Sequence, residues 1–367
     1  MPMIRPLLAY PLLAPPLLAM ATALASPAAA QTPASTSTPC NRACLAGKAD
    51  ALLASMVAHA PGDAPLAPVY RATENGVPAA LPMMTIWRTA SAADNRFYVI
   101  DTSNRQIFLL ANMGEGGANR TLLFARLHWA GTGFDEVELY EDRSRSDGGF
   151  QFDAAALGHL PPAWTDRIAP ARLPSRAQLL RAGQSIFDTA IDGPPPAPAC
   201  RMMENGKPVA EDPKVLEVVG VGSQPLPANA DGSVPVPCGA PPIRPTDANA
   251  RTLVVDEEQG IVVSIATVQG LVQPYLITDP TTSAFVPHSL GQPYFDLLAA
   301  QRKTGRYGHR PEIAPMPASI AVAQMHRYYD GQLQGMHLLE KLGPPDARSA
   351  WTAAPAPAPT KGAATHD

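Results

Sequence analysis

Two histidines and two aspartates have the side chains that general acid–base chemistry requires. His128 and His326 each end an apolar, strand-like segment, and Asp101 and Asp256 each lie in the apolar hairpin before it. An imidazole gives and takes a proton near neutral pH, and a neighbouring carboxylate can fix its tautomer. His128 with Asp101, and His326 with Asp256, are therefore candidate catalytic pairs.

The face of the strand decides whether His128 can act in this way. Alternation places His128 on the same face as Arg126 and Phe124. If that face is concave, His128 lines a pocket beside the hairpin of Asp101. The alternative is that both histidines cap hairpins at a solvent edge, and that Asp256 belongs only to a solvated acidic turn.

An Arg-x-x-Glu-Asn-Gly motif occurs twice, with Arg71 and Glu74 in the first copy and Arg201 and Glu204 in the second. Catalytic residues need to be retained in one copy only, whereas an interaction that stabilises the fold is needed in both copies. The duplication thus favours an Arg–Glu ion pair that ties a loop to a sheet, followed by a left-handed Asn-Gly turn. The alternative is a role in a pocket. Glu204 is then a further candidate catalytic carboxylate, and Arg71, Glu74 and Arg201 are candidate ligand-binding residues.

Only the second copy carries a long insertion, residues 279–317. It contains His288 and Tyr294, a helix-like stretch that begins at Phe295, and a basic stretch that ends at Arg310. Loops of this length in compact domains are usually functional or mobile. We therefore interpret the insertion as a lid over a pocket, with His288 and Tyr294 as candidate ligand-binding residues. The alternative is a surface decoration.

These candidate residues lie on an internal repeat whose segments recur in the same order. The motif is followed by an apolar hairpin around an aspartate, then a strand that ends in histidine, then a strand after a glycine. The matched strands are 122–128 with 320–326, and 134–140 with 333–339. A helix opens each copy, and Ser175 and Gln178 form a capping box at the start of the second. Each copy is thus predicted to be an α+β unit, one long helix followed by four or more antiparallel strands.

The order of these elements resembles the NTF2-like (SnoaL-like, cystatin-like) α+β cone. The motifs are similar to those of an exported bacterial and fungal family classed as a domain of unknown function. They are Cys40-Asn-Arg-Ala-Cys44-Leu45, Thr73-Glu74-Asn75, the Ser175 helix, the segments Cys200–Gly206 and Val254–Gly260, and Ser349-Ala-Trp351. The resemblance covers Cys40 to Trp351. It implies two tandem cones, each a long helix on a curved antiparallel sheet, packed as an intramolecular pseudo-dimer. It brings no catalytic residues, and Gln324 stands where the family leads us to expect an acidic residue.

The first thirty residues have the three parts of a secretory signal peptide. These are the basic Arg5, the apolar run from Leu7 to Leu24, and small residues that end at Ala30. Prolines in the run make it a poor membrane anchor. We expect cleavage after Ala30 and a periplasmic or secreted protein without a stable membrane span. The predicted boundaries are signal peptide 1–30, linker 31–39, first repeat 40–150, linker 151–171, second repeat 172–351 and disordered tail 352–367.

The chain has four cysteines, which in an exported protein suggest disulfides and allow three connectivities. Cys40 and Cys44 lie together at the start of a helix, whereas Cys200 and Cys238 flank a Pro/Gly-rich excursion. We favour the pairs Cys40–Cys44 and Cys200–Cys238. A zinc site is the rival interpretation, but the cysteines lack the spacing and the histidine partner that zinc requires, so we expect no metal.

Composition and missing motifs narrow the function. The formal net charge is −4 and no basic block is present, so a nucleic-acid partner is not expected. Nucleophile-elbow, zinc-protease and nucleotide-binding motifs are missing, and Gly114-Glu-Gly-Gly117 reads as a turn, so no cofactor is expected. We expect an exported protein with a pocket for a small molecule. It is either a cofactor-independent lyase, isomerase or hydrolase of an apolar cyclic compound, a non-catalytic binding protein, or an interaction module with filled cones.

Overall fold

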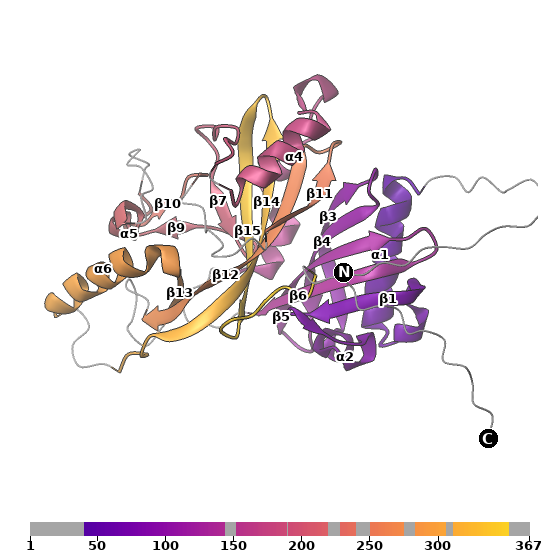
Figure 1. Cartoon of the computed structure of the whole chain (residues 1–367), viewed down its shortest axis with the longest axis horizontal. Helices are drawn as coiled ribbons and strands as arrows, with labels where there is room; N and C mark the ends of the chain where they lie inside the picture. Colours follow the sequence, from indigo (N-terminus) through magenta and orange to yellow (C-terminus); the bar gives the residue numbers. More distant parts are fainter. Residues whose placement is uncertain are drawn as a thin grey trace, which may run out of the picture. The chain divides into compact units, whose positions relative to one another are not determined.

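The computed structural model describes residues 40–143, 152–188, 190–218, 228–239, 250–274, 283–305 and 311–351. The predicted signal peptide, the linker that follows it and the C-terminal tail lie outside these ranges. Within them, no helix is long and apolar enough to cross a membrane. The described chain is a mixed α+β structure with two curled, mostly antiparallel sheets and few helices, which confirms the predicted class (Figure 1).

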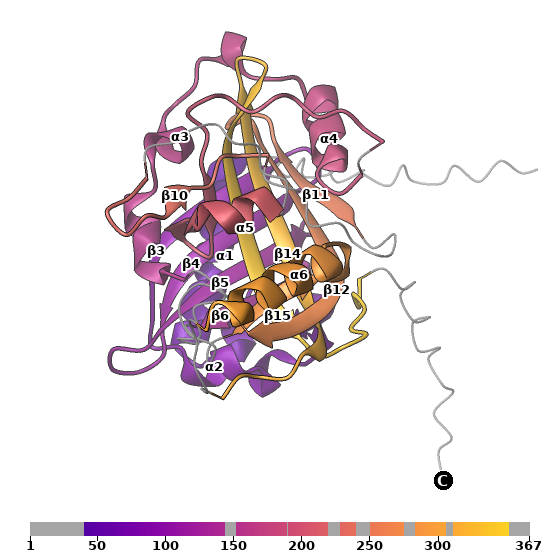
Figure 2. The same ribbon diagram turned by 90° about the vertical axis from the view of Figure 1, so that its left-hand side faces the viewer.

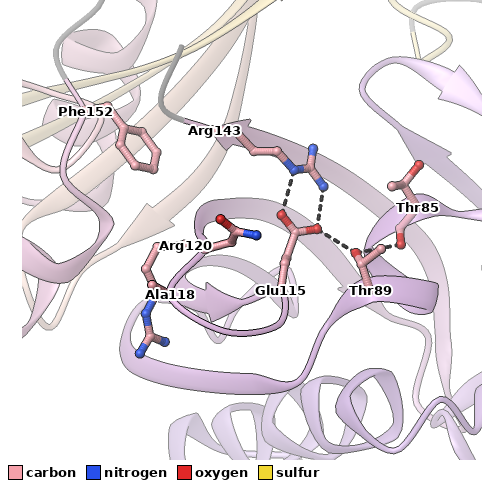
Figure 3. Close-up of a pocket in the computed structure, with 8 residues that line it drawn as sticks. Thr85, Thr89, Glu115, Ala118, Arg120, Arg143 and Phe152 are labelled. Carbon is pink, nitrogen blue, oxygen red and sulfur yellow. Dashed lines mark hydrogen bonds and ion pairs between the residues drawn. The ribbon is translucent and has the colours of Figure 1, made fainter. Parts of the chain in front are cut away.

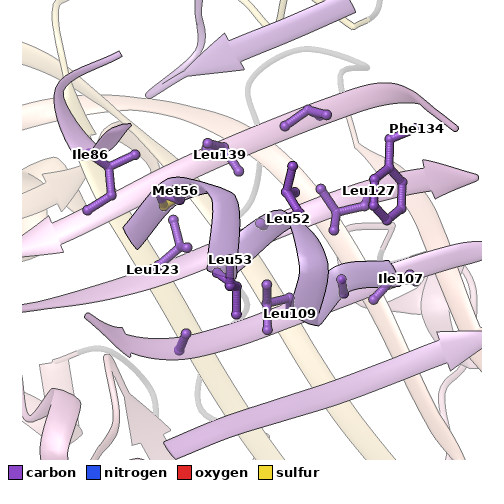
Figure 4. Close-up of a cluster of buried hydrophobic side chains, with 14 of the residues drawn as sticks. Leu52, Leu53, Met56, Ile86, Ile107, Leu109, Leu123, Leu127, Phe134 and Leu139 are labelled. Atoms are coloured by element: carbon purple, nitrogen blue, oxygen red, sulfur yellow. The ribbon is translucent and has the colours of Figure 1, made fainter. Parts of the chain in front are cut away.

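The first half of the chain forms a six-stranded sheet in the order β2-β1-β6-β5-β4-β3, with β1 and β6 parallel. Its elements are α1 (Arg42–Val57), β1 (Leu66–Glu74), β2 (Val77–Pro78), α2 (Thr85–Thr89), β3 (Ala92–Asp101), β4 (Gln106–Gly114), β5 (Arg120–Trp129) and β6 (Phe134–Arg143). Helix α1 begins after Asn41, whose side chain accepts the backbone N–H of Cys44. Leu52, Leu53 and Met56 of α1 pack on one face of this sheet (Figure 4).

The second half forms a seven-stranded sheet in the order β11-β12-β14-β15-β7-β8, with β13 paired to β12. Its sheet strands are β7 (Met202–Glu204), β8 (Lys207–Pro208), β11 (Arg251–Asp256), β12 (Ile261–Pro274), β13 (Ser283–Pro287), β14 (Met316–Tyr329) and β15 (Gln332–Gly343). The other elements are α3 (Pro162–Thr165), α4 (Arg176–Ser185), β9 (Ala210–Glu211), α5 (Pro213–Val218), β10 (Val234–Pro235) and α6 (Gly291–Lys303). The capping box of Ser175 and Gln178 is confirmed at the start of α4. Helices α5 and α6 lie next to each other (Figure 2).

The two sheets follow the same path, and their pairing registers define equivalent positions. Asp101, Gln106 and His128 lie side by side across β3, β4 and β5. In the second sheet the corresponding row is Asp256, Ile261 and Arg327, across β11, β12 and β14. In each half the register shifts immediately after the last residue of this row, at a β-bulge before the closing hairpin. The structural counterpart of His128 is therefore Arg327.

This equivalence corrects the predicted match of His128 with His326. The counterpart of His326 is Leu127, because the alignment of 122–128 with 320–326 is displaced by one residue. Side chains alternate along a strand, so a shift of one residue moves a side chain to the opposite face. Leu127 packs in the core under α1, and His326 pairs with Val262 and Met336, which pack in the core under α4. His128 lies on the other face of its own sheet.

The Asn-Gly turns of the duplicated motif hold the parallel strand pair in both halves. Asn75 and Asn205 have left-handed φ angles of 53° and 43°, which confirms the predicted turn. The Oδ1 atom of Asn75 accepts the backbone N–H of Glu141 at 2.9 Å. Asn205 accepts the backbone N–H of Glu340 in the same way at 2.8 Å. The asparagine side chain thus ties β1 to β6 and β7 to β15.

Two arginine–aspartate pairs, which we call the reciprocal clasp, join the halves. Arg42, the first residue of α1, donates to both carboxylate oxygens of Asp256 at 2.9 and 2.7 Å. Arg176, the first residue of α4, donates to those of Asp101 at 3.0 and 2.6 Å. Asp256 also accepts the backbone N–H of Ile100 at 2.8 Å. Since Asp101 and Asp256 are equivalent, each half supplies an arginine to the other.

Apolar side chains fill the space between the two sheets, and two disulfides fix local segments. One buried cluster combines Phe108, Phe124 and Tyr140 of the first half with Met325 and Leu339 of the second. The predicted pairs Cys40–Cys44 and Cys200–Cys238 are both confirmed. Disulfides are consistent with an oxidising environment.

Candidate functional site

The structure does not bring His326 to a carboxylate. His326 is buried, and its ring nitrogens lie 3.0 Å from the hydroxyl of Tyr328 and 3.1 Å from Oε1 of Gln324. Burial lowers the pKa of His326 to about 3, so the ring is neutral at physiological pH. Asp256 ends a row that faces the opposite side of the sheet and is bound in the reciprocal clasp. The predicted His326–Asp256 pair is therefore absent.

Glu204 is not placed to orient His326 either. In the pairing across β7, β15 and β14, Glu204 lies opposite Leu338, which lies opposite Gln324. His326 is two residues further along β14 than Gln324. Two strand spacings and two residues along a strand separate the two positions by roughly 10 Å or more.

His128 also lacks its predicted partner. Its Nδ1 lies 2.6 Å from Oδ1 of Asp135, at the partly exposed turn that joins β5 and β6. Asp101 instead accepts from Arg176 and from the backbone and side chain of Asn104. The pair predicted between His128 and Asp101 is wrong, because Asp101 is part of the reciprocal clasp.

The predicted ion pair within the first Arg-x-x-Glu motif is also wrong. Arg71 lies on β1 and bonds to Glu136 on β6 at 2.5 Å, and its guanidinium stacks on the ring of Trp351. Glu74 instead accepts the backbone N–H of Ile86 at 3.0 Å. In the second copy, Arg201 donates to two backbone carbonyls, those of Pro198 and Cys200.

Of the insertion of the second copy, the structure describes residues 283–305 and 311–317, and its strand does not lie beside His326. Its strand β13 pairs with residues 270–274 of β12, whereas His326 pairs with Val262. Eight residues of extended strand correspond to about 26 Å. Tyr294 anchors α6 by donating to the carbonyl of Pro274 at 3.0 Å, and His288 begins a short turn before that helix. The strand β13 of the predicted lid thus lies along residues 270–274 of β12, at the end of β12 that is distant from His326.

The larger of two cavities described here lies at one edge of the first sheet. It has a volume of about 600 Å³. Its lining residues are Thr85, Thr89, Glu115, Ala118, Asn119, Arg120, Arg143 and Phe152 (Figure 3). Helix α2 supplies the threonines, the turn between β4 and β5 supplies Glu115 to Asn119, and β6 ends at Arg143. We call this cavity the rim pocket.

A carboxylate and a guanidinium are locked together at the base of the rim pocket. Arg143 donates through Nε and Nη2 to the two oxygens of Glu115, both at 2.6 Å (Figure 3). The hydroxyls of Thr89 and Thr121 also bond to Glu115. Burial by itself raises the pKa of Glu115, but these hydrogen bonds outweigh it and lower the pKa to about 2. Glu115 is therefore ionised at every physiological pH.

Arg143 also bonds to Glu141, which has a second carboxyl group, that of Glu74, as its neighbour. Arg143 donates through Nη1 to Glu141 at 2.7 Å, and the Glu141 side chain is fully buried. Burial first, and then the neighbouring Glu74, raise the pKa of Glu141 to about 7, whereas the pKa of Glu74 is lowered. Oε1 of Glu141 finds no N–H or hydroxyl donor among the described residues. The raised pKa favours the protonated form of Glu141 beside the ionised Glu74.

A smaller cavity of about 250 Å³ lies between α4 and the hairpin of β14 and β15. Tyr328, whose hydroxyl bonds to His326, is among its lining residues, together with Gln178, Arg181 and Asp192. His326 itself is not. Among the described residues, no group of three or more His, Cys, Asp or Glu side chains could hold a metal ion.

Sequence reasoning missed Glu115, Glu141 and Arg143. The turn that contains Glu115 was expected to be no more than a turn, and the other two lie within a strand. A usable signal exists in the difference between the copies. Thr121 pairs with Arg143 in the first sheet, and the equivalent pair in the second sheet is Ile320 with Leu342. A correct register would have shown polar residues in one copy only.

No protein-family model, curated protein or solved structure matches this chain.

Proposed function

We propose that this chain is a small-molecule-binding protein and that its ligand occupies the rim pocket. The observation that carries the proposal is the Glu115–Arg143 pair, a bidentate ion pair at the base of a cavity of about 600 Å³. Ligand pockets of roughly 300–1,000 Å³ with a few precisely held polar groups are typical of small-molecule sites. The faces of the sheets that α1 and α4 cover are packed with apolar side chains, so the proposed site lies at the rim.

A cofactor-independent acid–base enzyme is the second candidate. Arg143 bonds to an ionised carboxylate, Glu115, and to Glu141, whose pKa of about 7 keeps it partly protonated near neutral pH. Carboxyl groups whose environments push their pKa values apart commonly take the roles of acid and base. Glu141 lies behind Arg143 and outside the pocket lining, so proton transfer to a ligand would require Arg143 to move.

The test is a ligand screen followed by matched variants of two equivalent positions. Native mass spectrometry of the full chain with fractionated small-molecule extracts should identify a ligand, and calorimetry should then give its affinity. We expect Arg143→Met to weaken binding by about tenfold or more, and Arg143→Lys to restore it only in part, since lysine cannot bond bidentately.

The control is Leu342→Met, a conservative change at the equivalent position of the second sheet, which should leave affinity unchanged. Equal effects of Arg143→Met and Leu342→Met would contradict the proposed site. Glu141→Gln separates the two candidate functions. A loss of turnover with binding retained supports an enzyme, whereas a binding protein shows no turnover in either form.

We further propose that the two halves are NTF2-like units that form an intramolecular pseudo-dimer. The shared strand order and the reciprocal clasp support this interpretation, because an isologous interface repeats each contact in both directions. An experimental structure with a different strand order in the two sheets would contradict it.

We propose that the protein is exported, as the first thirty residues predict. The two disulfides support a mature protein in an oxidising compartment. Intact-mass spectrometry of protein recovered from the periplasm or medium should show a chain that begins at Gln31 and has lost four hydrogens to its disulfides. A retained N-terminus at Met1 in that fraction would refute cleavage.

A further inference from the structure

The charges that line the rim pocket cancel within the protein. Arg143 is bonded bidentately to Glu115, and Arg120 is bonded to Asp94 at 2.9 Å. An anionic ligand that drew Arg143 away from its partner would leave the carboxylate of Glu115, whose side chain is only 9% exposed, without compensation. Such uncompensated charges are costly. The lining is therefore poorly suited to a charged ligand.

Apart from the charged residues, the rim pocket is lined by neutral hydrogen-bonding groups and by one aromatic ring. The side-chain amide of Asn119 makes no hydrogen bond to the described part of the chain. The hydroxyl of Thr89 already donates to Glu115 and to the carbonyl of Thr85, so the Thr89 hydroxyl can only accept a hydrogen bond from a ligand. Thr85 adds a second hydroxyl to the lining. Hydroxyl and amide groups both donate and accept. Phe152 is half-buried at the same cavity and offers an apolar face. A ligand with many hydroxyls and an apolar ring face satisfies all of these groups at once.

One lining position differs between the two sheets. Arg143 lines the rim pocket, and the equivalent residue of the second sheet is the apolar Leu342. The sheet topology therefore accommodates an apolar residue at this position.

We infer that the ligand of the rim pocket is a neutral, hydroxyl-rich molecule of the carbohydrate or polyol class. This inference rests on the proposed function and differs from the apolar cyclic compound expected from the sequence. A volume of about 600 Å³ accommodates a ligand of this kind. Recognition would come from the amide of Asn119 and the threonine hydroxyls, with the Glu115–Arg143 pair intact beneath them.

The experiment uses the full chain and a panel of neutral mono- and oligosaccharides and polyols, each matched with its uronic acid and its amino sugar. Glucose, glucuronate and glucosamine form one such set. We expect binding by at least one neutral probe, measured by calorimetry, and affinities for its two charged analogues that are lower by about tenfold or more.

Asn119→Ala should weaken binding of the neutral probe by about tenfold, since a ligand hydroxyl then loses its hydrogen-bond partner. The backbone hydrogen bond of Asn119 to Gly116 is kept in this variant, so folding should be unaffected. Thr304→Ala is the control, because Thr304 is exposed and lies at the C-terminal end of α6.

The inference is overturned if a charged analogue binds as tightly as its neutral parent, if no neutral probe binds, or if Asn119→Ala leaves affinity unchanged. In those cases the proposed function still stands when another class of molecule binds in an Arg143-dependent manner. The proposed function itself fails only when no molecule of any class shows such dependence.

Discussion

The two halves of this protein have the same sheet topology. The residues that both halves share have a different role from the residues that only one half has. Shared positions hold the fold together. Asn75 and Asn205 clamp the parallel strands in the same way, and Asp101 and Asp256 receive an arginine from the opposite half. The structural role that the duplication of the motif predicted is thus carried by its asparagine.

The candidate site of the first half combines an unshared position with a shared one. At the rim of its sheet are Glu115 and Arg143, with Glu141 behind them. The second half retains Glu340 at the position of Glu141 but has apolar Leu342 in place of Arg143. The comparison of the two copies therefore singles out Arg143 as a difference, whereas Glu141 is common to both.

Removal of one aspartate of the reciprocal clasp should have the largest effect on stability, and the size of the effect should differ between the two aspartates. Asp256→Ala leaves three backbone N–H groups, among them that of Ile100, without their acceptor, and leaves Arg42 only a distant contact with Glu258 at 3.9 Å. We expect a loss of about 3–5 kcal/mol of unfolding free energy. Asp101→Ala should cost less, since Asp101 accepts from one backbone N–H and Arg176 keeps a contact with Glu257.

Urea unfolding monitored by circular dichroism measures both values. Asp330→Asn is the control, because it neutralises a surface pair with Arg172 and asparagine tolerates the left-handed φ of 54° at this position, so stability should change little. If Asp101→Ala were at least as damaging as Asp256→Ala, the asymmetry that we infer from the backbone contacts would not exist.

The equivalent glutamates should make stability fall as pH rises. Burial raises the pKa of Glu141 to about 7 and that of Glu340 to about 8, from an ordinary value of 4.5. The folded state holds protons that the unfolded state has released, so this stability is present below pH 4.5 and is lost through pH 7 or 8.

Glu141→Gln should remove its part of the decline, up to about 3 kcal/mol at the alkaline end, and Glu340→Gln should act over a wider pH range. Unfolding free energies of each variant and the parent across this range give the difference directly. Curves that run parallel to the parent at all pH values would show that these carboxyl groups titrate normally.

The asparagine clamps should show the smallest effect. Asn205→Gly keeps the left-handed turn and removes only the acceptor for the N–H of Glu340, so we expect a loss of about 1–3 kcal/mol. Asn75→Gly should cost less, because Asn205 is fully buried and Asn75 is only partly buried. Thermal unfolding of the two variants tests this order. An equal or inverted order would mean that burial does not set the strength of the clamp.

Much of the scaffold could be predicted from the sequence, because local chemistry specifies it. The Asn-Gly pairs favour a left-handed turn in any context, and the Ser175–Gln178 box starts a helix through bonds within one turn. Both disulfides join cysteines whose pairing follows from their grouping along the chain. The order of the repeated segments likewise predicted the α+β class.

The tertiary structure alone decided which side chains meet. One residue of strand register separates His326 from the counterpart of His128, and this places the two histidines on opposite faces. Asp101 and Asp256 were expected to serve their own halves, yet each binds an arginine from the other half. The Glu115–Arg143 pair joins a turn to the end of a distant strand. Such contacts depend on register and packing between segments far apart in the chain, which no local pattern specifies.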